Sequence, residues 1–231
     1  MEYVTLRNDV EIPQLGFGVF QIAPQDTKDV VLKAIENGYR HFDTAQAYYN
    51  EEGVGDAIAE SGIPREEFFI TTKVWHSDHG YEQTKKACEE SLKKLKTDYI
   101  DLYLIHQNIG DVFATWRALE DLYKEGRVKA IGVCNFTKSR FANLALHSEI
   151  TPMVHQIEVN PFYQQEGIEK FHDKFDTKVE AWGPLAEGRD GIFENPILSE
   201  IGDKYGKSVA QVILRWLIQR GIIVFLKSVK S

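Results

Sequence analysis

The chain has 231 residues, of which 43% are hydrophobic and 27% are charged, and its formal net charge is -8. Such values are typical of a globular protein, so we expect one domain over residues 1–231. The acidic balance excludes the basic surface that nucleic-acid binding needs, and no apolar run approaches the roughly 18 to 20 residues of a membrane span.

The N-terminal residues M-E-Y-V-T-L lack the basic and apolar regions of a signal peptide, and two cysteines are too few for a disulfide framework. The sequence therefore predicts a cytoplasmic protein, which we expect to be a monomer.

Two short alternating runs at 4–6 and 10–12 flank a turn-rich trio and predict a β-hairpin. A regular alternation of strands and helices follows. The apolar pattern predicts strands at 16–20, 41–43, 68–73, 99–105, 128–133, 153–159, 177–182 and 222–226. The residues expected to begin or cap helices are Asp26, Asp111, Thr137, Pro196 and Ser208. Eight such units can form an open doubly wound sheet or a closed barrel. The count of eight favours the closed α/β fold, a (βα)8 TIM barrel with the hairpin at its bottom.

The glycines do not form a dinucleotide-binding fingerprint. Gly16 and Gly18 lack the third glycine of that motif, and Gly53 and Gly55 fall inside a predicted helix. A nucleotide that binds this chain is therefore expected to bind in another manner than in a Rossmann fold.

Candidate catalytic residues lie at the ends of consecutive strands. Asp43, Lys73 and His106 end the second, third and fourth predicted strands, and Tyr48 follows the first of these. Neighbouring strand ends of a barrel lie roughly 5 Å apart, so the four side chains are expected to share a pocket. Taken singly, each has an ordinary alternative: a helix cap, a half-buried aromatic, a solvated lysine and a core histidine.

Together these residue types suit acid catalysis. A tyrosine with an ordinary pKa near 10 is a poor proton donor at neutral pH, and a nearby ammonium such as Lys73 is expected to draw that pKa down. Asp43 would keep Lys73 charged and oriented. His106 would donate a hydrogen bond to a substrate oxygen beside Tyr48.

Motifs along the whole chain resemble those of the aldo-keto reductase family, in the branch of the bacterial 2,5-diketo-gluconate reductases and prostaglandin F synthases. In order they are G-F-G-V-F, G-Y-R-H-F-D-T-A, Y-x-N-E-E-x-V-G, T-T-K-V-W, D-Y-I-D-L-Y-L-I-H, L-Y-K-E-G-R-V-K-A-I-G-V-C-N-F, H-Q-I-E-V-N-P, A-W-G-P-L and L-K-S-V. The resemblance implies NADPH-dependent reduction of aldehydes and ketones to alcohols. It also implies a catalytic tetrad of Asp43, Tyr48, Lys73 and His106, with Tyr48 as the general acid and no metal.

The resemblance further implies residues for the cofactor and the substrate. Those expected to bind NADPH are Asn135, Gln156, Trp182, Gly183, Pro184 and Leu185, together with Lys227 and Ser228 at the adenosine 2′-phosphate. The nicotinamide ring would stack on Trp182. Those expected to line the pocket of a small carbonyl substrate are Phe20, Tyr49, Trp75 and Gln107.

Several positions depart from the family's usual residues. Gln107 stands where tryptophan is common, Cys134 and Gly183 where serine is usual, and Leu226 where proline is usual. The two lost hydroxyls would remove cofactor contacts of about 0.5 to 1.5 kcal/mol each. Family members also continue past K-S-V with a helix and a loop that contact the cofactor, so we expect this chain, which ends at Ser231, to bind NADPH weakly.

Two other functions compete with this interpretation. One is a non-catalytic barrel that binds NADPH as a sensor or regulatory subunit. The other is a Schiff-base aldolase that uses Lys73, which we disfavour because Asp43 would keep the amine protonated.

Overall fold

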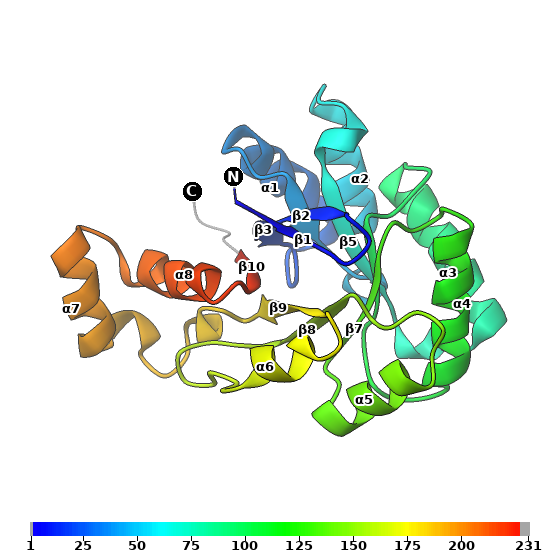
Figure 1. Ribbon diagram of the computed structural model, residues 1–231. Coiled ribbons are helices and arrows are strands. Elements are labelled where there is room, and N and C mark those ends of the chain that lie inside the picture. The colour runs from blue at the N-terminus through cyan, green and yellow to red at the C-terminus, as the bar shows by residue number, and fades with distance from the viewer. Residues whose placement is uncertain (1, 227–231) are drawn as a thin grey trace.

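Eight parallel strands close into a barrel in the computed structural model, which describes residues 2–226 (Figure 1). Around the barrel the strand order is β10-β3-β4-β5-β6-β7-β8-β9, and the pairing of Phe225 with Gly16 closes the ring. The strands are β3 (Leu15–Gly18), β4 (His41–Asp43), β5 (Phe69–Val74), β6 (Leu102–Ile105), β7 (Ile131–Cys134), β8 (Val154–Glu158), β9 (Lys178–Trp182) and β10 (Ile223–Leu226). The predicted TIM barrel is confirmed; Lys227 and Ser228 lie outside the described residues.

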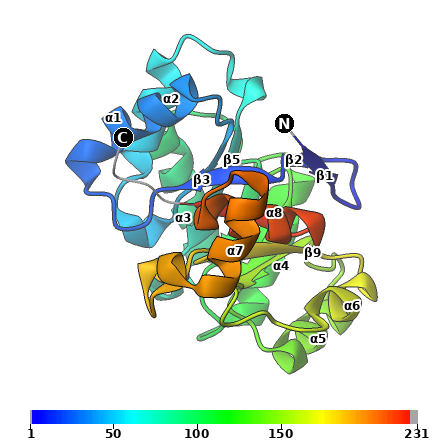
Figure 2. The same ribbon diagram turned by 90° about the vertical axis from the view of Figure 1, so that its left-hand side faces the viewer.

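Helices connect the strands on the outside of the barrel. They are α1 (Pro24–Glu36), α2 (Glu51–Glu60), α3 (Tyr81–Leu95), α4 (Val112–Lys124), α5 (Lys138–Leu146), α6 (Ile168–Asp173), α7 (Pro196–Tyr205) and α8 (Val209–Gln219). Short 3-10 turns are η1 (Gln46–Tyr48), η2 (Arg65–Glu67), η3 (His76–Asp78), η4 (Ala186–Gly188) and η5 (Ile192–Glu194). Figure 2 shows α7 and α8 lying against each other in front of the barrel. No helix in the described part of the chain is long and apolar enough to span a membrane.

Most of the predicted helix starts are confirmed. The side chains of Asp111, Thr137 and Ser208 each accept a hydrogen bond from a backbone N–H of the helix they precede. The prediction for Asp26 is wrong, because α1 already begins at Pro24. Asp26 instead lies in the first turn, where the helix dipole favours a carboxylate.

The fourth strand is shorter than predicted. β6 begins at Leu102 rather than at residue 99, and Ile100 forms only an isolated bridge to Val128. The Asp101 carboxylate explains this start, because it accepts hydrogen bonds from the Arg65 guanidinium and the backbone N–H of Ile70. The backbone N–H of Ile70 thus bonds to a side chain at this position.

The N-terminal hairpin covers the bottom of the barrel, as predicted. Its strands are β1 (Tyr3–Thr5) and β2 (Glu11–Pro13), and Leu6 and Ile12 are buried. Arg7, in the turn between them, donates hydrogen bonds to the carbonyl oxygens of Pro152 and Phe175, in the segments before β8 and β9. The hairpin thereby leaves the opposite end of the barrel, where the strands terminate, free to form a site.

Candidate active site

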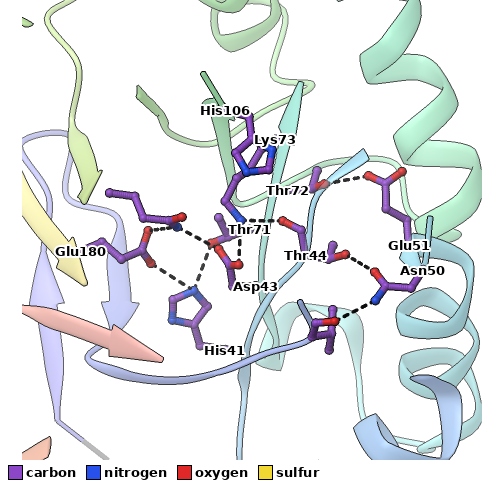
Figure 3. Close-up of polar contacts among 12 residues, drawn as sticks. His41, Asp43, Thr44, Asn50, Glu51, Thr71, Thr72, Lys73, His106 and Glu180 are labelled. Atoms are coloured by element: carbon purple, nitrogen blue, oxygen red, sulfur yellow. Dashed lines mark hydrogen bonds and ion pairs between the residues drawn. The ribbon is translucent and has the colours of Figure 1, made fainter. Parts of the chain in front are cut away.

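An ion pair between β4 and β5 forms the base of the site (Figure 3). The Lys73 Nζ donates to Asp43 Oδ1 at 2.7 Å and to the carbonyl oxygen of Thr44 at 2.8 Å. Both charged side chains are buried. Parallel pairing of β4 with β5 and of β5 with β6 places their carboxyl ends together, which is why the three predicted strand-end residues converge.

Asp43 determines the charge of Lys73. Burial acts to lower the pKa of Lys73, but the attraction and hydrogen bond of Asp43, together with the electrostatic effects of Tyr48 and Cys134, raise this pKa above its ordinary value. The amine is therefore protonated at neutral pH and is a poor nucleophile. This charge state argues against the Schiff-base alternative.

Tyr48, in η1, contacts both of its predicted partners. Its ring centroid lies 5.1 Å from the Lys73 Nζ and 5.6 Å from the His106 ring. Burial raises the pKa of Tyr48 to about 12, while Lys73 acts in the opposite direction. The expectation that Lys73 would bring this pKa below its ordinary value is therefore wrong for this structure, because desolvation of the phenolate is the larger effect.

His106 is a neutral imidazole in this environment. Burial, followed by the positive charge of Lys73, lowers its pKa to about 3. Its ring packs edge-on against Trp75 at 4.9 Å, and Nδ1 is buried without a hydrogen-bond partner among the described residues. A neutral imidazole has one N–H to donate, so His106 has the chemistry to bind a carbonyl oxygen.

A second group of polar side chains comes from the opposite side of the barrel. The Trp182 indole N–H donates to Asn135 Oδ1 at 2.8 Å, and Asn135 Nδ2 donates to the carbonyl oxygen of His106 at 3.3 Å. Asn135 has a φ of 59°, a left-handed conformation that asparagine tolerates better than most residues. These bonds hold the edge of the Trp182 ring next to the tetrad.

Gln156 connects the ion pair to a residue that the sequence analysis missed. Its Nε2 donates to Asp43 Oδ2 at 2.9 Å and to Glu180 Oε2 at 2.9 Å. Glu180 lies inside the barrel on β9 and is completely buried. A carboxylate in the middle of the predicted strand 177–182, between Val179 and Ala181, was the signal that could have identified it.

A cavity of about 960 Å³ lies above these residues. It is lined by the predicted site residues Asp43, Tyr48, His106, Asn135, Gln156, Trp182, Gly183, Pro184, Leu185, Phe20, Trp75 and Gln107. Lys73 lies beneath it, bonded to Asp43. The lining also includes residues that were not predicted to bind a ligand, namely Gly18, Gln21, Ala47, Glu187, Gly188, Phe193, Phe225 and Leu226.

The structure does not place Tyr49 in this wall. Tyr49 directly follows η1 in a left-handed conformation with a φ of 57°, and its side chain is 81% exposed. The turn thus directs the Tyr48 side chain toward the cavity and the Tyr49 side chain toward solvent. Gly183 is also left-handed, with a φ of 60°, which suits glycine better than the serine usual at this position.

Among the described residues, no group of three or more histidine, cysteine, aspartate or glutamate side chains is arranged to hold a metal ion.

Comparison with known proteins gives consistent matches over the whole chain. The model of the Aldo/keto reductase family matches residues 14–190. The chain is 48% identical over 230 residues to glyoxal reductase of Bacillus subtilis, a match covering 99% of this chain and 83% of that protein.

Solved structures agree. An aldo/keto reductase from Brucella melitensis superposes with a TM-score of 0.95 at 49% identity, covering 99% of this chain and 89% of the other. A mutant of Gox0644 in complex with NADPH superposes with a TM-score of 0.94 at 38% identity, covering 99% and 83%. From the match to the family model, the relatives and the barrel, the chain belongs to the aldo/keto reductase family.

Proposed function

We propose that this protein reduces small aldehydes and dicarbonyl compounds to alcohols, with NADPH as the reductant and Tyr48 as the proton donor. The observation that carries the proposal is the convergence of Tyr48, the Lys73–Asp43 ion pair and a neutral His106 at one cavity. In this arrangement Tyr48 would supply the proton, the Lys73–Asp43 pair a positive charge beside it, and His106 an N–H donor.

The residues expected to hold the cofactor fit a nicotinamide ring and its carboxamide. Gln156 has donated both amide hydrogens to Asp43 and Glu180, so only its carbonyl oxygen is left, and this oxygen suits an amide N–H₂. One N–H of the Asn135 amide bonds to the backbone carbonyl oxygen of His106, so the second N–H is left for the carbonyl oxygen of the carboxamide. Trp182, held by its N–H, offers an aromatic face for stacking.

When bound, NADPH supplies a hydride to the carbonyl carbon. His106 would donate its N–H to the carbonyl oxygen and hold it beside the Tyr48 hydroxyl. Tyr48 then transfers its proton to that oxygen as negative charge develops there. Lys73 stabilises the phenolate left on Tyr48, and Asp43 keeps Lys73 charged and in place.

The cavity wall supports a small or aromatic carbonyl substrate. Phe20, Trp75 and Phe193 contribute apolar surface, and Gln107 contributes an amide where the family resemblance implies an indole. Glyoxal, named in the Bacillus subtilis relative, is our first candidate for a small substrate. Because Gln107 leaves more room on its side, larger aromatic aldehydes are also candidates.

The test is NADPH oxidation by the purified chain with glyoxal, methylglyoxal and a series of larger aldehydes and ketones. Turnover of at least one carbonyl, abolished by Tyr48→Phe, is the expected result. NADPH binding without turnover of any carbonyl would instead favour the sensor or regulatory barrel, which the relatives' activities do not favour.

We also propose that the protein prefers NADPH to NADH, is cytoplasmic, is a monomer and forms a single domain. Lys227 and Ser228, the residues expected to select NADPH, lie outside the described residues. Titration with both cofactors and sedimentation in solution test the first and third of these proposals directly.

A further inference from the structure

Glu180 occupies the interior of the barrel below the residues to which we assigned catalysis (Figure 3). One of its oxygens, Oε2, accepts a hydrogen bond from Gln156. The other, Oε1, is buried without a hydrogen-bond partner among the described residues, and His41 Nε2 lies 3.7 Å from it. A buried carboxylate with one unbonded oxygen is costly when it is ionised.

His41 does not supply a compensating charge. Its Nδ1 lies 3.1 Å from the carbonyl oxygen of Pro13, so Nδ1 carries the hydrogen and donates, and Nε2 accepts from the Thr71 hydroxyl at 3.0 Å. Burial lowers the pKa of His41 to about 4, so the ring is neutral near pH 7. Oε1 of Glu180 therefore faces a neutral ring nitrogen that carries no hydrogen, so His41 cannot stabilise an ionised Glu180 carboxylate.

Asp43 adds a second reason for Glu180 to be protonated, because both carboxyls bind the same Gln156 amide. Burial, and then the negative charge of Asp43, raise the pKa of Glu180 to about 8, while Gln156 and Lys73 act to lower it. The titratable groups that face Glu180 are His41 and Asp43 on β4, Lys73 on β5 and Cys134 on β7. Only Lys73 among them is positively charged near neutral pH.

We propose that Glu180 is a positioning residue for carbonyl reduction: in its neutral form it holds Gln156 in place and leaves the Lys73 charge available to Tyr48, and its ionisation slows the reaction. The inference rests on the function proposed above. When Glu180 loses its proton, a second negative charge enters the barrel beside Lys73. That charge disfavours the Tyr48 phenolate, so Tyr48 becomes a weaker acid as the pH rises.

Glu180→Gln tests this inference, because it keeps the shape and a hydrogen-bond acceptor for Gln156 but never ionises. The measurement is kcat/KM for carbonyl reduction from pH 6 to pH 9.5, with the variant and the wild-type protein side by side. The ratio of variant to wild type should rise by roughly threefold or more across this range, since only the wild type gains the extra charge. A ratio that is constant with pH, whether high or low, would overturn the inference.

Glu120→Gln is the matched control. Glu120 is also buried and accepts two hydrogen bonds, from the Trp116 indole N–H and the backbone N–H of Ile150, but it lies on α4 outside the barrel. Its substitution should leave the dependence of kcat/KM on pH unchanged. If Glu180→Gln does not fold, Glu180→Met removes the same titrating group with an apolar side chain of similar length.

A second readout needs neither cofactor nor substrate. Infrared spectra of the ligand-free wild-type protein should show a protonated carboxyl band that disappears with a midpoint near pH 8, as the raised pKa of Glu180 requires, and that Glu180→Gln lacks. Absence of this band would overturn the inference. If the band is present but no carbonyl is reduced, the proposed function fails and the positioning role of Glu180 fails with it. An active wild type with a pH-independent ratio refutes the role of Glu180 alone.

Discussion

Lys73 and Asp43 face each other from adjacent strands, with 2.7 Å between Nζ and Oδ1, and neither side chain is accessible to solvent beyond 2%. Ion pairs at such depth are maintained by close geometry and by further hydrogen bonds, which the Thr44 carbonyl oxygen and the Gln156 amide supply here. The pair is thus both a structural element of the barrel and the electrostatic support of Tyr48.

Lys73→Met should destabilise the protein, because it leaves the Asp43 carboxylate buried without its counter-charge. The expected loss is about 3 to 5 kcal/mol in the free energy of unfolding, measured by urea denaturation near pH 7. The double variant Lys73→Met with Asp43→Asn is the control and should recover part of the loss. Equal stability of the single and double variants would show that the unpaired carboxyl carries no such cost.

Tyr48→Phe should lower kcat for carbonyl reduction by about 10² to 10⁴-fold, because the ring keeps its packing against Phe20 while the proton donor is removed. NADPH affinity, followed by quenching of tryptophan fluorescence, should change by less than threefold. Tyr49→Phe is the matched control, since the neighbouring phenol is exposed and lies outside the cavity lining. Wild-type turnover in Tyr48→Phe would remove Tyr48 from the acid role.

Gln107→Trp should narrow the cavity on the side that Gln107 lines. We expect kcat/KM for a bulky aromatic aldehyde to fall by tenfold or more, because the added ring occupies space in the cavity that Gln107 lines. The value for glyoxal should change by less than threefold. Equal losses for both aldehydes would indicate that Gln107 acts on the catalytic groups rather than on pocket size.

Buried histidines should make the protein sensitive to acid. Burial lowers the pKa of His172 to about 4 and that of His155 well below the ordinary 6.5. Below pH 6.5 the unfolded chain therefore binds protons that the folded chain does not, and stability falls as the pH decreases toward 4. Each such group contributes a slope of up to about 1.4 kcal/mol per pH unit.

Urea denaturation at a series of pH values measures this slope. His172→Gln should make it shallower, because glutamine can still accept the hydrogen bond from His155 Nδ1 but does not titrate. His147→Asn, at an exposed histidine, should leave the slope unchanged. A slope equal to wild type in His172→Gln would show that this histidine is not the cause.

The sequence alone determined the barrel and the set of candidate catalytic residues. Apolar runs typical of strands alternate with runs of helical periodicity, and this unit repeats eight times. The caps Asp111, Thr137 and Ser208 mark helix starts, because a capping hydrogen bond involves only residues close together in the sequence. Asp43, Lys73 and His106 could be placed at one edge because parallel strands all end on the same side of a barrel.

Only the tertiary structure decided which groups touch and what charge they carry. The bridge from Asp43 through Gln156 to Glu180 joins residues far apart in the chain, and no local pattern specifies it. The raised pKa of Tyr48 likewise depends on burial, which a count of nearby charges does not reveal. Desolvation and hydrogen bonding act over a few ångströms in space. The contacts and charge states of these side chains can therefore be determined only from the closed barrel.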